Sequence, residues 1–422
     1  MLHSLQLLPG VTLRCFRDDR FKQGCLSLQF LRPMCPEEAS LNALLPAVLL
    51  RGCREYPDLR SITQRLDDLY GASVSALARR VGDYQTTGFY CAFMDDRFAL
   101  AGDRILEPVI DLVRMLLLEP VIHDESFSPE FVESEKQNLT AAIESDLNDK
   151  RAYAASRLLR TMCKADSYGI PRRGTVEQVA AITPESLYRH YRKVLRESPV
   201  ELFYVGFRTP EQIAPVLKTL LEGIDRCYVN LPAQTAFHDA GGSDVTEQMD
   251  VTQAKLCMGF VTPITNRTAD FAAMQVFNTL FGSGMTSKLF MNIREKLSLC
   301  YAISSDYFGS KGILTVSAGI DSAKADLTRS QILQQLEDCC QGRFTAEELA
   351  AAKAALRSSL LGVHDAPGSI EGYYGTAALS GMNMTPEAYL AAVEAVTAEA
   401  VTKAAASLRL HTVYLLKEES PC

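Results

Sequence analysis

The feature that most constrains the fold of this chain is an internal repeat: a short apolar segment ending in Pro occurs once in each half. Residues 25–33 read CLSLQFLRP and residues 256–263 read LCMGFVTP, so that Phe30 and Pro33 correspond to Phe260 and Pro263. In both halves a polar turn and an amphipathic helical pattern follow. Such a repeat predicts two copies of one supersecondary unit.

The ends of the two halves are also alike. The sequence ITPE at 182–185 precedes a helical pattern and an apolar strand pattern at 201–205, and VTAE at 396–399 precedes the same succession with a strand at 412–416. The predicted fold class is therefore α+β, a tandem duplication of an α/β unit, each an antiparallel sheet with helices packed on it. The predicted units are residues 1–229 and 251–422, joined by a polar, Gly-containing linker at 230–250.

Local patterns predict the main elements of each unit. The first unit is expected to contain strands at 26–30 and within 74–93, helices at 58–69 and 108–118, and a long helix that begins after Ser128 and runs to about residue 163. The second unit is expected to contain a hairpin with strands at 301–308 and 313–320.

Composition excludes several classes of protein. The chain has 422 residues, a formal charge of −8 and 47% hydrophobic residues, which is typical of a globular protein and argues against nucleic acid as a partner. Its twelve cysteines are scattered and form no Cys-x-x-Cys, so that free thiols in a reducing compartment are expected. No membrane span and no secretory signal are predicted, and we expect a cytoplasmic protein.

The most informative motif is the stretch 281–301, FGSGMTSKLFMNIREKLSLCY. An amphipathic helix over 273–281 is predicted to end at Gly282, where a residue free to adopt positive φ is favoured. A second helix is predicted after Gly284, followed by a strand from Cys300. This places Arg294 near a helix end and Tyr301 at the start of a strand.

This stretch resembles the substrate-side motif of the pitrilysin and insulinase family of metallopeptidases, which includes the mitochondrial processing peptidases. The match comprises a Gly-rich turn, a Ser-x-Leu-Phe helix and an Arg-Glu-Lys-x-x-x-x-Tyr run. The resemblance implies that Arg294 and Tyr301, with Gly282 and Gly284 in the turn, bind a peptide substrate through a guanidinium fork and a phenol. The alternative is an ordinary helix-end Arg with an interface Tyr.

The zinc motif of that family is missing. The resemblance implies that the positions of its His-x-x-Glu-His motif are Ala43, Pro46 and Ala47, and that the downstream Glu falls near Ala142, with Glu144 as a nearby carboxylate. No two of the six histidines lie one helical turn apart, although a site built from distant residues stays open. Pro46 is expected to kink the helix or to delay its start.

The pattern resembles a catalytically inactive, YfmF-like branch of bacterial homologues. It implies a non-catalytic subunit without a metal or cofactor of its own, which pairs with a zinc-bearing homologue and encloses the peptide in a closed chamber. Two alternatives remain: a purely structural subunit, or an independent hydrolase with an unrecognised site. The isolated chain could also form homodimers. No Gly-x-Ser-x-Gly, Walker or dinucleotide-binding motif points elsewhere.

Overall fold

The computed structural model describes residues 2–419 of the chain, and contacts divide these into two compact units. Unit 1 comprises residues up to 144, 171–233 and 364–376, and unit 2 comprises residues 145–170, 234–363 and those from 377 onwards. Neither unit is contiguous in sequence. The units therefore differ from the ranges 1–229 and 251–422, because each half of the chain lends one segment to the other unit.

Unit 1 is built on a six-stranded sheet in the order β1-β2-β8-β3-β5-β4. All neighbours are antiparallel except β2 and β8, which are parallel. The strands are β1 (Leu2–Leu8), β2 (Val11–Arg17), β3 (Gln23–Pro33), β4 (Ser73–Val81), β5 (Tyr84–Met94) and β8 (Val200–Gly206). A separate small hairpin is formed by β6 (Ile122–His123) and β7 (Ser126–Phe127).

Unit 2 is built on a five-stranded sheet in the order β11-β12-β10-β13-β9. Here β13 and β9 are the parallel pair. The strands are β9 (Ser243–Gln248), β10 (Ala254–Val261), β11 (Cys300–Phe308), β12 (Ile313–Ile320) and β13 (Arg409–Lys417).

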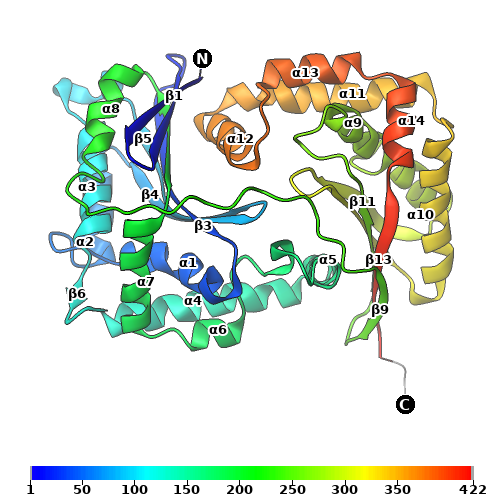
Figure 1. The fold of residues 1–422 in the computed structure, drawn as a ribbon, viewed down its shortest axis with the longest axis horizontal. Helices are drawn as coiled ribbons and strands as arrows, with labels where there is room; N and C mark the ends of the chain where they lie inside the picture. The colour runs from blue at the N-terminus through cyan, green and yellow to red at the C-terminus, as the bar shows by residue number, and fades with distance from the viewer. Residues whose placement is uncertain (1, 420–422) are drawn as a thin grey trace. The chain divides into compact units, whose positions relative to one another are not determined.

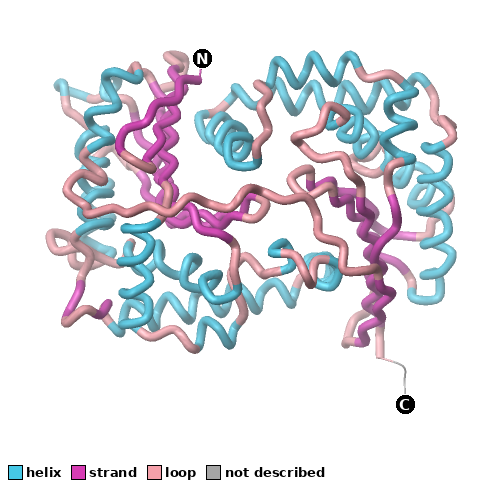
Figure 2. The backbone as a smooth tube through the Cα atoms, in the orientation of Figure 1, coloured by secondary structure: helices cyan, strands magenta, loops and turns pink. Residues whose placement is uncertain are grey.

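The two sheets confirm the duplication. Phe30 lies on β3, between β8 and β5, and Phe260 lies on β10, between β13 and β12. In the first sheet β2 runs parallel to its neighbour β8, and in the second sheet β9 likewise runs parallel to its neighbour β13. Because β9 occupies 243–248, the predicted linker 230–250 is only partly a linker. Residues 224–242 form the irregular loop drawn in Figure 2.

Helices cover both sheets (Figure 1). The helices of unit 1 are α1 (Pro36–Leu49), α2 (Leu59–Asp68), α3 (Leu106–Leu118), α4 (Pro129–Asn148), α6 (Val176–Ala180), α7 (Pro184–Glu197) and α8 (Pro210–Lys218). Apolar side chains of α1, α3 and α7 form one continuous core with those of the sheet. None of the helices within residues 2–419 combines the length and the apolar character that a bilayer span requires.

Unit 2 carries its own helices. They are α5 (Lys150–Met162), α9 (Phe271–Phe281), a π-helix (Leu289–Lys296), α10 (Ala325–Cys340), α11 (Ala346–Leu361), α13 (Pro386–Ala395) and α14 (Ala398–Ala406). The apolar face of α9 is almost wholly buried and contacts β11, α11 and α14.

Two segments are exchanged: each belongs to the unit that is formed mainly by the other half of the sequence. The long helix predicted after Ser128 is in fact two helices, α4 and α5, because Asp149 accepts hydrogen bonds from the N–H groups of Arg151 and Ala152 and begins a new helix. From there α5 packs on β10 and β13 of unit 2.

The other exchanged segment is α12 (Pro367–Ser380), of which residues up to 376 belong to unit 1. Ile370 and Tyr374 pack against Phe16 and Phe203 of the first sheet. The buried Glu371 forms an ion pair of 2.7 Å with Arg79 of β4. Each sheet thus carries a helix from the other half of the sequence.

Candidate substrate site and the degenerate metal positions

The candidate substrate site begins at the Gly-rich turn after α9. Gly282 ends this helix with φ −151°, so the prediction of a positive φ there was wrong. A side chain at this position would instead collide with its surroundings, because a Cβ would lie 2.4 Å from Ser305 Oγ and 2.8 Å from Leu289 Cδ1. Gly284 is the residue that takes a positive φ, of 132°. Both glycines therefore shape the turn, and their contact with a peptide stays a prediction.

Arg294 lies in the π-helix that follows the turn. The last hydrogen bonds of this helix span five or six residues, from Leu297 N to Asn292 O and from Leu299 N to Ile293 O. The Arg294 guanidinium stacks over the Phe290 ring at 4.5 Å and lies 3.7 Å from the Glu295 carboxylate. Among the described residues it has no other ion pair and donates no hydrogen bond, so its donors are open to a ligand.

Tyr301 projects from a bulge at the start of β11. The register of β11 on β12 shifts between Cys300 and Ala302, so that Tyr301 is the extra residue. Its side chain is 75% exposed. The strand is fastened to the turn, because Ser305 N donates to Gly282 O at 3.0 Å. The motif is therefore one connected structure that presents Tyr301 to solvent.

Exposed apolar side chains gather around these two residues. Four of the eleven large apolar side chains that are exposed in the described chain lie within 285–301. They are Met285, Met291, Leu297 and Tyr301. An accumulation of this kind on so short a stretch is typical of a binding surface.

The degenerate metal positions lie on α1 and α4 of unit 1. Ala43, Pro46 and Ala47 carry no atom that can bind a metal ion, so these residues do not fit zinc. The helix continues through the buried Pro46 from Pro36 to Leu49, so the alternative of a late start was wrong. On α4, Ala142 is half-buried and Glu144 is exposed. Within residues 2–419 no group of three His, Cys, Asp or Glu side chains could hold a metal.

A buried amide and imidazole network lies beside these positions and was not predicted. Asn42 on α1 accepts a hydrogen bond from His190 Nε2 at 2.8 Å and donates to Gln85 Oε1 at 2.9 Å. Burial lowers the pKa of His190 to about 4, because its charged form would lose hydration that Asn42 does not replace. At neutral pH His190 is therefore an uncharged structural residue.

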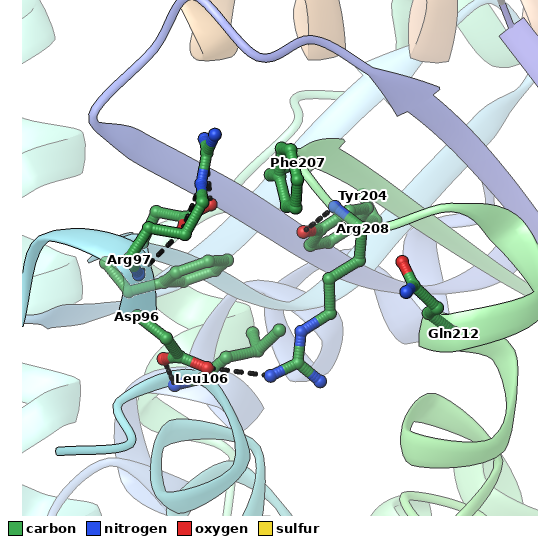
Figure 3. Close-up of a pocket in the computed structure, with 9 residues that line it drawn as sticks. Asp96, Arg97, Leu106, Tyr204, Phe207, Arg208 and Gln212 are labelled. Atoms are coloured by element: carbon green, nitrogen blue, oxygen red, sulfur yellow. Dashed lines mark hydrogen bonds and ion pairs between the residues drawn. The ribbon is translucent and has the colours of Figure 1, made fainter. Parts of the chain in front are cut away.

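A cavity of about 250 Å³ opens at the end of β8 (Figure 3). Phe93, Tyr204 and Phe207 form much of its wall. The Arg208 guanidinium lies 2.7 Å from both Asp96 and Glu107. Because this cation is held by two carboxylates, it serves to fix the loops at this edge of the sheet.

Thiol chemistry does not supply an alternative active site near the motif. Burial raises the pKa of Cys300, beside Tyr301, to about 11, and that of Cys257 on β10 to about 11. Both are protonated thiols at neutral pH and thus poor nucleophiles.

Arg294, Tyr301, Gly282 and Gly284 all belong to unit 2, and Ala43, Pro46, Ala47 and Ala142 belong to unit 1. Fold and sequence together define a class of proteins: duplicated α+β units that have an Arg and Tyr motif like that of the peptidases but no metal ligands at positions 43, 46 and 47 of the first helix.

Comparisons with known proteins identify the family. A family described as "Peptidase M16 inactive domain" matches residues 181–356. The Bacillus subtilis protein "Probable inactive metalloprotease YmfF" is 31% identical over 408 residues, which cover 97% of this chain and 96% of that protein. This chain therefore belongs to the M16 peptidase family, the pitrilysin and insulinase family of the resemblance. The printed name of this relative describes an inactive metalloprotease, in agreement with the catalytically inactive, YfmF-like branch that the resemblance implied.

Solved structures agree with this assignment. A conserved protein from Enterococcus faecalis has a TM-score of 0.92 and 28% identity and covers 100% of this chain, with 99% of its own chain covered. A peptidase M16 inactive domain from Pseudomonas fluorescens has a TM-score of 0.81 and 16% identity, with both chains fully covered. The second likeness shows the fold alone.

Proposed function

We propose that this chain is a non-catalytic, cytoplasmic subunit of a bacterial M16-type peptidase. It pairs with a zinc-bearing homologue, encloses a peptide together with it, and supplies Arg294 and Tyr301 to that peptide. The observation that carries the proposal is a contrast between the two units: metal-binding atoms are absent at positions 43, 46 and 47 of α1, whereas unit 2 has a half-buried Arg294 in its π-helix and an exposed Tyr301 on β11.

The roles of the two residues follow from their chemistry. A guanidinium offers several N–H donors in one plane and can hold a peptide carbonyl oxygen or the negative charge that develops on it during hydrolysis. The Tyr301 phenol can donate one further hydrogen bond to the same chain. Since this chain has no metal ligands at the implied positions, the attacking water must be activated in the partner.

The test is reconstitution. This chain is co-expressed with the zinc-bearing M16 homologue of the same organism, and cleavage of a fluorogenic unstructured peptide is measured. Arg294→Ala is expected to lower kcat/KM by about 10²-fold, as the loss of one oxyanion donor does elsewhere. Arg357→Ala, which removes an exposed ion pair with Glu394 on a different helix, is the matched control and should leave cleavage unchanged.

The outcomes separate the alternatives. A complex whose cleavage is insensitive to Arg294→Ala and Tyr301→Phe would make this chain a structural subunit. Failure to form any complex with the homologue would contradict the pairing itself.

A further inference from the structure

Five cations surround the first residues of β11, all within unit 2. The guanidinium of Arg151 on α5 donates to Ser304 Oγ on β11 at 2.9 Å. Lys324 Nζ lies 3.4 Å from the carbonyl oxygen of Ser298, just before the strand. We call Arg151, Lys255, Arg294, Lys296 and Lys324 the β11 cations.

The strand register places Lys255 in the same neighbourhood. Lys255 of β10 pairs with Gly319 of β12, and Gly319 pairs with Ala302 of β11. Lys255 is therefore two strands away from the residue that follows Tyr301, about 10 Å at the usual spacing of strands. Arg294 and Lys296 lie in the π-helix, whose Arg294 carbonyl accepts a hydrogen bond from Ser298 N.

The β11 cations bind almost only neutral partners. Lys255 donates to the Gln253 amide oxygen and Lys296 to the Asn292 amide oxygen. The one carboxylate within ion-pair distance of any of the five is Glu295, at 3.7 Å from Arg294, among the residues that the structure describes.

Several other cations of unit 2 form ion pairs with acids. Such ion pairs are Lys311 with Asp166, Arg329 with Asp244, Arg343 with Asp338, and Arg357 with Glu394.

Four carboxylates lie near the β11 cations. Asp149 and Asp321 accept hydrogen bonds from N–H groups at the starts of helices and keep their negative charge. With Glu295 and the exposed Asp306 of β11 they stand against five cations. Because only Glu295 lies within ion-pair distance among the described residues, four of the five cations remain available to an anionic ligand, in a chain whose net charge is −8.

We propose that the peptide bound at Arg294 and Tyr301 is acidic: its carboxylates contact the β11 cations, while its apolar side chains contact Met285, Leu297 and Tyr301. This inference rests on the proposed function and specifies its substrate class. The exposed apolar side chains favour a peptide over a nucleic acid, because they give no favourable contact to a phosphate backbone. Complementary charge raises the rate of association and disfavours partners of the wrong charge.

The test measures binding to the full chain by fluorescence anisotropy. Three labelled, unstructured 12-residue peptides share their apolar residues and differ in the remainder, which is acidic, neutral or basic; a single-stranded oligonucleotide is the fourth probe. At about 50 mM salt the acidic peptide should bind about tenfold more tightly than the neutral one, and the advantage should shrink as salt rises. The basic peptide should bind most weakly.

Variants of the full chain test which residues produce the preference for the acidic peptide. The double variant Arg151→Gln and Lys255→Gln should bring the affinity ratio of acidic to neutral peptide close to one. Arg151→Lys keeps the charge and should keep the ratio, as should the control Arg357→Gln. Thermal unfolding of each variant checks that the fold is retained.

Equal affinity for acidic and neutral peptides, or tighter binding of the oligonucleotide, would overturn this inference and leave the cleavage test of the proposed function standing. Absence of binding for all peptides would also overturn it. The loss of cleavage in the reconstituted Arg294→Ala complex judges the proposed function independently.

Discussion

The junction before β4 in unit 1 and the junction before β11 in unit 2 are counterparts in the repeat, and they differ in how they are closed. In unit 1, α2 ends at Asp68, Tyr70 follows it with φ 60°, and the Tyr70 hydroxyl donates to Asp103 at 2.6 Å. The following strand pairs with β5 without a shift of register. In unit 2, the π-helix ends near Ser298 at φ 50°, and the next tyrosine, Tyr301, stands in a bulge and faces solvent.

One copy of a duplicated fold can therefore keep the architecture although the tyrosine at its junction is exposed to solvent rather than bonded to a neighbouring loop. Both copies use a left-handed residue to leave the helix. Only unit 1 uses its tyrosine to fasten neighbouring loops. Strain, bulges and exposed aromatic residues that contribute nothing to stability are typical of positions retained for binding.

The hairpin that follows the junction in unit 2 contains a buried ion pair, and breaking this pair should destabilise the protein most. Lys311, in the turn between β11 and β12, is fully buried and lies 3.0 Å from Asp166. Lys311→Met should lower the free energy of unfolding by about 3 to 5 kcal/mol, because it leaves a buried carboxylate without its cation. Urea unfolding followed by circular dichroism measures this. Arg357→Met breaks an exposed ion pair and should lower the free energy of unfolding by less than about 1 kcal/mol. Equal losses in the two variants would contradict the larger role given to the buried pair.

Acid should weaken the protein through His190 of unit 1. The folded pKa of about 4 lies below the ordinary value of 6.5, because burial disfavours the charged imidazole. The contribution of the neutral His190 to the free energy of unfolding is therefore fully present above pH 6.5. It is lost as the pH drops toward 4, which lowers the free energy of unfolding by up to about 3 kcal/mol. His190→Gln should remove this slope in urea titrations at several pH values.

A second acid transition belongs to Glu38. Its burial opposes ionisation, but hydrogen bonds from Arg32 and Lys193 outweigh burial and lower the Glu38 pKa to about 2. Its contribution is lost only between about pH 4.5 and pH 2, so the two groups are separable. Loss of stability above pH 4.5 that persists in His190→Gln would contradict the prediction for His190.

The Gly-rich turn should be sensitive to volume. Gly282→Ala is expected to cost about 1 to 3 kcal/mol, since the new methyl group meets Ser305 and Leu289. Gly372→Ala, in α12, meets nothing within 4 Å and should stabilise the protein by up to about 1 kcal/mol. Urea midpoints of the two variants that shift in the same direction would refute the crowding argument.

The smallest effect separates the two tyrosines. Tyr70→Phe loses the hydrogen bond to Asp103 and should lower the free energy of unfolding slightly, whereas Tyr301→Phe should leave it unchanged. Thermal unfolding of the two variants measures this difference. A destabilised Tyr301→Phe would show that Tyr301 serves the fold rather than a ligand.

The sequence was sufficient for the architecture because the repeat, the strand patterns and the helix caps are local signals. It failed where the outcome depends on distant residues. The strand β9 has an alternating polar pattern at a sheet edge, so it resembled a linker. The exchange of α5 was hidden because a capped break at Asp149 predicts a new helix but not the sheet on which it packs.

In the candidate site, too, residues of a contiguous motif were predicted, and residues placed by distant contacts were not. Arg294 and Tyr301 were predicted from a contiguous motif, although the bulge that exposes Tyr301 depends on the register with β12. Arg151 and Lys255 could not have been assigned to this surface, since Arg151 belongs to the first half of the sequence and reaches Ser304 only through the exchange.

The proposed function requires that this chain contributes binding residues to the complex but catalyses no hydrolysis on its own. The most direct measurement is the zinc content of the purified chain, together with its cleavage of an unstructured peptide before and after treatment with a chelator. We expect substoichiometric zinc and no chelator-sensitive cleavage until the zinc-bearing homologue is added. One tightly bound zinc ion per chain, with proteolysis that the chelator abolishes, would contradict it.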